Sequence, residues 1–188
     1  MILRDSLRSL MLPLSLIDDS LPKQGVILEL GCGEGVIAQF LARSTKRHLT
    51  GMDINKKRLP KTKNKNLKFI CADLTNKSLK LPVADGVVIS DVLHHINTNE
   101  QKILISKIAT SLKKDGVFVI KEIDKEEKIR SALSRFWDFI LYPKDQIYYW
   151  NAKDLKKYLE SLKFTIEIKR TNRFFPGSTT LFFCKINK

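Results

Sequence analysis

The sequence predicts an α/β protein in which one mostly parallel, seven-stranded sheet carries helices on both faces. Three observations support this prediction. A buried apolar run, residues 26–30, leads directly into the glycine turn Gly31-Cys32-Gly33-Glu34-Gly35, and apolar residues at helical spacing follow it. Strand and helix patterns then alternate as far as about residue 122, an order typical of parallel sheets with right-handed crossovers. Two further segments of alternating polarity near the end of the chain complete seven strands.

A helical segment, residues 1–21, precedes the sheet. Its first part has apolar residues on one face and charged residues between them, which predicts an amphipathic helix. It lacks the uninterrupted apolar core and cleavage site of a signal peptide. Pro13 interrupts the pattern, residues 14–21 predict a second short helix, and Pro22 and Gly25 introduce the first strand.

The middle of the chain follows the alternating order. After the glycine turn we expect a helix over residues 34–43 and a short helix beginning at Asn55, which Pro60 ends. Thr98 begins a longer helix, and the basic glycine turn at residues 113–116 closes it. The predicted core face of that helix consists of Ile103, Leu104, Ile108 and Leu112. The predicted strands after the first are residues 49–54, 67–72, 84–91 and 117–121.

The last third of the chain differs in composition. Residues 124–150 are first charged and then aromatic, and we expect a helix followed by an irregular, aromatic-rich stretch. Asn151 begins another helix, and residues 164–169 and 179–186 alternate as two strands. With no repeat and no linker, residues 1–188 are predicted to form a single domain.

Charge and cysteine usage exclude several classes of protein. The net charge is +14, and the basic segment, residues 43–68 from Arg43 to Lys68, holds ten Lys or Arg residues against one acid, Asp53. It contains no aromatic residue, so a solvated basic face is favoured over an RNA or anionic-membrane partner. No apolar run approaches the ~20 residues of a membrane span. Three widely spaced cysteines predict reduced thiols in a cytoplasmic protein, with no metal site.

The spacing of the glycines separates two kinds of nucleotide site. A dinucleotide fingerprint reads G-x-G-x-x-G, whereas this chain has G-x-G-x-G, with Val36 where the third dinucleotide glycine would fall. Glu29 lies just ahead of the turn and contributes a carboxylate. A carboxylate there favours a cationic ligand over a pyrophosphate.

Acidic residues recur where the predicted parallel strands end: Glu29, Asp53, Asp73 and Asp91. Ligands of such sheets bind outside the carboxyl ends of the strands. A lone Asp at one of these places would be better explained as a cap or turn residue. The ordered set of four favours one ligand-binding edge.

The run Glu29-x-Gly31-x-Gly33-x-Gly35, together with these acids, resembles the class I S-adenosylmethionine-dependent methyltransferases, which have a Rossmann-like fold with a closing antiparallel hairpin. The resemblance implies that Asp53 binds the ribose hydroxyls. It implies that Asp73 receives the adenine amino group, with Ile54 and Leu74 beside the ring. The methionine part would pass over Gly31, Cys32 and Gly33, and Ser90 with Asp91 would lie beside the sulfonium and the acceptor.

The stretch from Asp73 to Gly86 is similar to the type-11 group of small-molecule methyltransferases. This resemblance implies methyl transfer to a small-molecule or lipid-like acceptor, with S-adenosyl-L-homocysteine as the product. His94 or His95 could act as a base, although packing of the loop or contact with the cofactor explains this pair slightly better. Residues 124–150 fall where relatives have a lid or acceptor pocket, with Tyr142, Tyr148, Tyr149 and Trp150 as candidate pocket residues.

Two other functions remain open on the sequence. Asp91 and Lys121 fall where ribose 2′-O RNA methyltransferases keep an Asp and a Lys, although the flanking motifs of those enzymes are missing. Neither the Asn/Asp-Pro-Pro-Tyr run of amino methyltransferases nor a Pro-Cys nucleophile pair occurs. RNA is therefore the leading rival acceptor. A non-catalytic module that binds S-adenosylmethionine is the other alternative.

Overall fold

The computed structural model describes residues 12–122, 147–171 and 179–188. The predicted first helix, most of the proposed lid and Tyr142 lie outside these residues. The described helical elements are α2 (Leu14–Ser20), α3 (Val36–Leu41), the 3₁₀ turn η1 (Leu93–His95), α4 (Thr98–Ser111) and α6 (Ala152–Ser161). The strands are β1 (Gly25–Leu30), β2 (Arg47–Asp53), β3 (Leu67–Cys71), β4 (Ala84–Ser90), β5 (Leu112–Glu122), β6 (Phe164–Thr171) and β7 (Thr179–Ile186).

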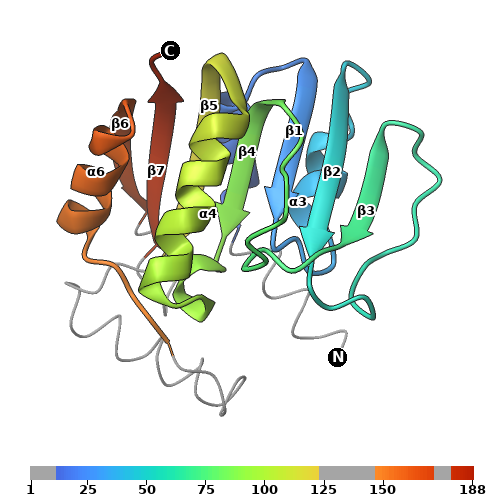
Figure 1. Cartoon of the computed structure of the whole chain (residues 1–188). Coiled ribbons are helices and arrows are strands. Elements are labelled where there is room, and N and C mark those ends of the chain that lie inside the picture. The colour runs from blue at the N-terminus through green and yellow to red at the C-terminus, as the bar shows by residue number, and fades with distance from the viewer. Residues whose placement is uncertain (1–11, 123–146, 172–178) are drawn as a thin grey trace.

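These strands form one seven-stranded sheet in the order β3-β2-β1-β4-β5-β7-β6. The first five are mutually parallel, and β7 runs antiparallel to both β5 and β6. Figure 1 shows the parallel strands pointing downward and β7 pointing upward. The predicted fold class, including the closing antiparallel hairpin, is therefore confirmed. We call the edge formed by the carboxyl ends of β1 to β5 the carboxyl rim.

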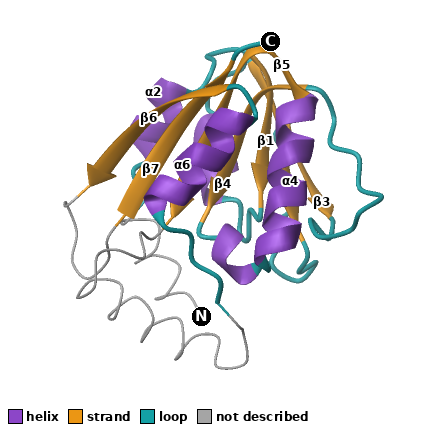
Figure 2. Ribbon diagram, turned by 60° about the vertical axis from the view of Figure 1, so that its left-hand side comes forward, coloured by secondary structure: helices purple, strands orange, loops and turns teal. Residues whose placement is uncertain are grey.

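Helices cover both faces of the sheet (Figure 2). One apolar layer joins α4 and α6 to the sheet, with Leu104 and Leu155 buried against Leu28 and Ile120. The other layer joins α2 and α3 to the opposite face through Ile17, Ile37 and their neighbours. Because the central strands are buried on both faces, their sequences read as continuous apolar runs.

The predicted core face of α4 is partly wrong. Ile103 is 38% exposed, whereas Ile105 is fully buried. The N-cap residue is Asn97, whose side chain accepts a hydrogen bond from the backbone N–H of Glu100, and the helix then turns Gln101, Leu104, Ile105 and Ile108 inward. Which of the two isoleucines is buried depends on how α4 is rotated about its axis. The apolar periodicity of one helix does not determine this rotation.

Two local predictions also differ from the structure. Asn55 begins a turn and not a helix, because its side-chain oxygen accepts the backbone N–H of Lys57. Residues 113–116 lie within the irregular start of β5, where the register with β4 shifts between Ala84 and Gly86. No helix among the described residues is long and apolar enough to cross a membrane.

The basic segment is not uniformly solvated. Arg47 is 1% exposed and forms an ion pair with Asp18 of α2. Its guanidinium also donates hydrogen bonds to the backbone oxygens of Pro22 and Leu21. Arg47 therefore links α2 to the start of β2. The prediction of a solvated basic face is wrong at this position. The lysines of the segment are exposed, as predicted.

Candidate functional site

The site begins with the contact between Asp53 and the glycine turn. Asp53 is the last residue of β2 and is 8% exposed. One carboxylate oxygen accepts the backbone N–H of Gly33 at 2.7 Å, and the other accepts that of Asn55 at 2.8 Å. Each oxygen keeps a further lone pair on the carboxyl rim. The carboxylate is thus held in a fixed orientation and can still accept two hydroxyl groups.

The backbone of the glycine turn follows a path that side chains would obstruct. Gly31 has φ +72°, and a Cβ built there would lie 2.3 Å from a methyl carbon of Val92. Gly33 has φ +53°, and a Cβ would lie 2.7 Å from the guanidinium of Arg58. Left-handed backbone and close packing both select glycine here. The turn is a cradle of bare backbone beside Asp53, which fits a nucleoside-linked ligand.

The rim beyond Asp53 offers an apolar and a polar group. Ile54 is 67% exposed although it is a large apolar residue. Asp73, two residues after β3, is also exposed, and its carboxylate accepts the backbone N–H and the hydroxyl of Thr75. These hydrogen bonds lower the pKa of Asp73, so it is anionic at neutral pH. Leu74 is instead packed in the core, which leaves Ile54 as the better platform for a flat ring.

Two predicted cofactor residues lie in the protein interior. Glu29 is 4% exposed and accepts the backbone N–H of Ala38 in the first turn of α3 at 2.8 Å. Burial raises the pKa of Glu29 to about 8. The hydrogen bond from Ala38 acts in the opposite direction, and the negative charge of Asp53 adds a smaller increase. Burial also raises the pKa of the Cys32 thiol. Glu29 therefore holds the helix that follows the glycine turn, and its expected cofactor contact stays a prediction.

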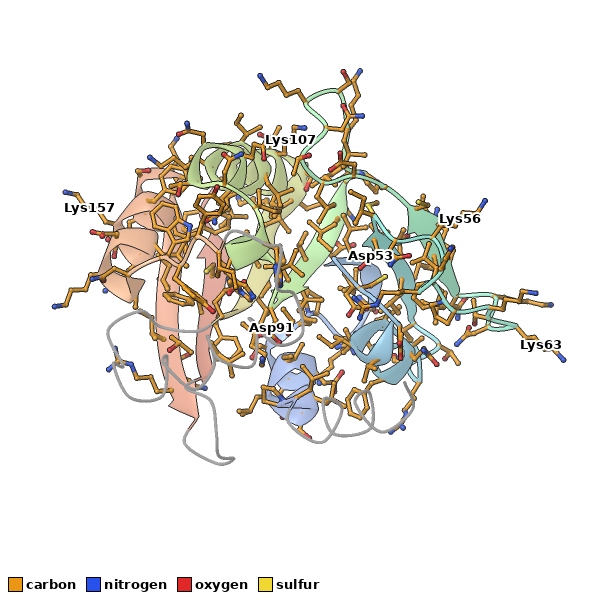
Figure 3. The ribbon with its side chains drawn as sticks, turned by 90° about the horizontal axis from the view of Figure 1, so that it is seen from below. Asp53, Lys56, Lys63, Asp91, Lys107 and Lys157 are labelled. Carbon is orange, nitrogen blue, oxygen red and sulfur yellow. The ribbon has the colours of Figure 1, made fainter. Side chains whose placement is uncertain are left out.

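An ion pair occupies the rim where β4 and β5 end. Nζ of Lys121 lies 2.7 and 2.6 Å from the two carboxylate oxygens of Asp91, and the hydroxyl of Ser90 lies 3.2 Å from one of them. Asp91 has φ 55°, a left-handed conformation uncommon for residues other than glycine. Asp53 and Asp91 occupy the same rim when it is viewed end-on (Figure 3). The pair gives this part of the rim one cationic and one anionic group.

The predicted histidines have different environments. His94 is 2% exposed, and its Nδ1 lies 2.6 Å from a carboxylate oxygen of Glu122. His95 is partly exposed, and its ring centroid lies 4.3 Å from that of His94. The orientation of the His94 ring is therefore fixed by its contact with Glu122, while His95 is the more exposed of the two histidines.

The aromatic stretch, residues 148–150, packs against the turn after β4 and is hydrogen-bonded to it. The backbone N–H of Tyr148 donates to the carbonyl of His94 at 2.8 Å, and Tyr149 stacks on the His94 ring with centroids 5.3 Å apart. Trp150 stacks on Tyr158 and donates its indole N–H to Gln101. The cavity behind these residues measures about 10 Å³, which is room for about one water molecule. Trp150 is thus engaged in packing, and Tyr149 is the member of the stretch whose ring stacks on His94.

Sequence reasoning missed three residues that shape the site: Glu122, Gln101 and Arg58. Glu122 follows Lys121 at the end of β5, and its position at a strand end was the available signal. Gln101 is fully buried on α4 and donates to the backbone oxygens of Ile96 and Tyr148. Its sequence context carried no signal. Among the described residues, no group of three or more His, Cys, Asp or Glu side chains is arranged to hold a metal ion.

The strand order, the bare glycine turn and the acid at the end of β2 define a class I S-adenosylmethionine-dependent methyltransferase. A family model described as a methyltransferase domain matches residues 3–167. The chain belongs to this family of methyltransferases.

Solved structures share its fold. An S-adenosylmethionine-dependent methyltransferase from Archaeoglobus fulgidus superposes with a TM-score of 0.76 at 19% identity, over 96% of this chain and 93% of that one. Magnesium protoporphyrin IX methyltransferase from Synechocystis, with bound S-adenosylhomocysteine, gives a TM-score of 0.69 at 22% identity, over 92% and 78%. At these identities the likeness concerns the fold alone.

A curated relative is a tRNA (carboxymethyluridine(34)-5-O)-methyltransferase from Arabidopsis thaliana, 28% identical over 119 residues. The match spans 63% of this chain and 29% of that protein. The matched region thus represents less than a third of the relative.

Proposed function

We propose that this enzyme transfers a methyl group to an oxygen or nitrogen atom of a small organic acceptor bound at the carboxyl rim between Asp91 and His95. The observation that carries the proposal is the pairing of Asp91 with Lys121 on the same rim as Asp53. One end of the rim suits a nucleoside, and the other presents polar groups to an acceptor.

Asp53 is proposed to bind both ribose hydroxyls of the cofactor, because each of its oxygens retains an acceptor position. Gly31 and Gly33 would let the methionine part lie against the backbone. Ile54 and Asp73 would contact the adenine face and its amino group. S-adenosylmethionine, when bound, supplies a methyl group on a positively charged sulfur.

The protein's contribution to such a displacement is chiefly to hold the two reactants in line. Asp91 is proposed to accept a hydrogen bond from the acceptor, and Lys121 to donate one, through the ion pair at the end of β4 and β5. An acceptor that carries a proton must also lose it. His95 is proposed as the proton acceptor, since histidine exchanges protons near neutral pH and His95 is more exposed than His94.

Tyr149 is proposed to cover the acceptor. Its ring stacks on His94, and its neighbour Tyr148 is hydrogen-bonded to the turn after β4 and to Gln101. Aromatic side chains bury a large apolar area and suit an enclosed organic pocket. The acceptor is therefore proposed to be a small or lipid-like molecule with one polar group.

The direct test incubates the protein and methyl-labelled S-adenosylmethionine with fractionated metabolite, lipid and RNA extracts. The proposal predicts label in a small-molecule or lipid product, with less than a tenth of that turnover for Tyr149→Ala. The triple variant Lys56→Ala/Lys57→Ala/Lys61→Ala serves as the matched control, because these lysines are exposed in the basic segment. Arg58 is left intact because it packs against Gly33. Label confined to RNA would contradict the proposal.

RNA is the second candidate acceptor. The tRNA methyltransferase relative and the exposed lysines after β2 both favour it. On this alternative the triple lysine variant would lose activity and Tyr149→Ala would not. Binding would also weaken steeply with salt, because phosphate contacts release counterions. Measuring both variants at low and high salt therefore distinguishes the two acceptors.

A further inference from the structure

A groove of about 720 Å³ lies between α4 and the loop that joins β3 to β4. The loop wall contributes Lys77, Lys80 and Val83, and the helix wall contributes Lys102, Ile103 and Lys107. Among the described residues, no Asp or Glu lines the groove. Its walls carry four positive charges around an aliphatic floor.

Among the residues that the structure describes, several surface lysines form ion pairs with acidic residues, but the lysines of the groove do not. Lys113 pairs with Asp85, and Lys156 with Glu160. Within the described part of the chain, no carboxylate forms an ion pair with any of the four groove lysines, and the contacts of Lys102 and Lys107 are with neutral groups. Lys107 donates to the carbonyl of Asn76 at 2.7 Å, and Lys102 lies 5.9 Å from the centre of the Tyr158 ring. Their charges remain available to an anionic partner.

The floor of the groove exposes apolar surface. Val83 is 62% exposed and Ile103 38%, and both are among the few large apolar residues that the described chain leaves exposed. Leu79 and Leu81 pack against the core from the loop wall and extend this floor. Exposed apolar residues gathered in a hollow and rimmed by charge mark an interaction surface.

The shape of the groove favours a helical occupant. Its helix wall runs along α4 from Lys102 to Thr110, a length of ~12 Å at the rise of an α-helix. That length matches about two turns of a second helix, whose apolar residues at i, i+3 and i+4 would face the floor. Carboxylates at the edges of such a helix would meet lysines on both walls.

We propose that this groove binds an acidic amphipathic segment of a partner protein. An RNA occupant fits less well, because the one aromatic residue among the described residues of the lining already packs against other side chains. Tyr158 stacks on Trp150, and its hydroxyl contacts Ser106 and the carbonyl of Lys102. A base would therefore find aliphatic groups and lysines but no ring on which to stack.

The experiment selects binders from a random 16-residue peptide library on the whole 188-residue chain and measures the affinity of the enriched peptides by fluorescence anisotropy. The expected peptides carry Asp or Glu together with apolar residues at a spacing of three to four. The groove variant Lys80→Glu/Lys107→Glu should weaken their binding at least tenfold, and Ile103→Ser should weaken it severalfold. The control variant Lys61→Glu/Lys63→Glu reverses two exposed charges in the basic segment, on a different side of the molecule from Lys107 (Figure 3), and should bind normally.

Three outcomes would overturn the proposal. The first is no enrichment of acidic amphipathic peptides. The second is equal loss of peptide binding in the groove and control variants, which would mean general attraction to a basic protein. The third is that binding of an RNA hairpin or of phosphatidylglycerol vesicles depends on Lys80 and Lys107, whereas the binding of no peptide does. Circular dichroism of each variant checks that the fold is retained, since all substituted side chains lie at the surface.

Discussion

Glu122 binds the turn after β4 through both of its carboxylate oxygens, one of which lies 2.6 Å from Nδ1 of His94. The other oxygen accepts the backbone N–H groups of Val92 and Leu93 at 3.1 and 2.8 Å. Glu122 and His94 are both buried. A single carboxylate therefore fixes the backbone of the turn and the orientation of the His94 imidazole, against which the rings of His95 and Tyr149 pack.

Replacing this carboxylate should affect stability and turnover together. Glu122→Ala removes the acceptor of three donors, two of them buried and one partly buried, and we expect a loss of roughly 3 kcal/mol in the free energy of unfolding. Glu122→Gln keeps an oxygen for the two backbone N–H groups and should lose about 1 kcal/mol. Because its amide presents a donor to His94, turnover should still fall at least tenfold. Urea unfolding and methyl-transfer assays measure the two effects.

Glu167→Gln is the control for these variants, because Glu167 lies on edge strand β6 away from the carboxyl rim and its carboxylate is exposed. Full turnover of Glu122→Gln would mean that His94 needs no fixed orientation.

The buried Glu29 should make stability depend on pH. Its pKa is raised from 4.5 to about 8 in the folded protein, chiefly by burial. The folded state therefore holds a proton that the unfolded state releases between these values, and stability falls as pH rises through this window. The stabilising effect is complete below about pH 4.5 and lost above about pH 8. The slope is at most ~1.4 kcal/mol per pH unit.

Glu29→Gln removes this titration while keeping an oxygen for the N–H of Ala38. The difference in unfolding free energy between wild type and Glu29→Gln should therefore shift against the wild type by a few kcal/mol from pH 5 to pH 8. Urea unfolding at several pH values gives both curves. Curves that stay parallel across the window would show that Glu29 is ionised in the folded protein throughout.

Arg47 should be one of the most costly positions in the basic segment. Arg47→Ala leaves the backbone oxygens of Leu21 and Pro22 without this buried donor and leaves Asp18 with Lys23 as its remaining ion-pair partner. We expect a loss of about 2–4 kcal/mol in the free energy of unfolding. Lys46→Ala, at the exposed neighbouring position, should change it by less than about 0.5 kcal/mol. Equal effects of the two variants in thermal or urea unfolding would contradict the structural role of Arg47.

The fold could be predicted almost completely from the sequence, because its central strands are apolar on both faces and two of its helices, α4 and α6, have clear N-caps. Asn97 and Asn151 cap α4 and α6 at the predicted starts. Errors occurred where tertiary contacts decide. Ile105, and not the predicted Ile103, is buried in the core because of the rotation of α4. Arg47 is buried because Asp18 lies opposite it.

The candidate site was predictable in part. The placement of Asp53, Asp73 and Asp91 at strand ends follows from the topology, and the structure brings them to one rim. The partners of those residues could not be predicted, because β4 and β5 lie side by side only in the folded sheet. The contacts of Lys121 with Asp91 and of Glu122 with His94 depend on that pairing. The role of Glu29 as a helix support also requires its burial to be known.

The contact between Asp53 and the cofactor is the central claim, and isothermal titration calorimetry tests it most directly. The wild type should bind S-adenosylmethionine and S-adenosylhomocysteine but not NAD. Asp53→Ala should bind both at least tenfold more weakly, since hydrogen bonds to a charged group contribute roughly 1.5–3 kcal/mol each. Asp115→Ala, which removes an exposed carboxylate outside the rim, is the matched control and should bind normally. Binding of NAD by the wild type, or unchanged affinity of Asp53→Ala for S-adenosylmethionine, would contradict the account.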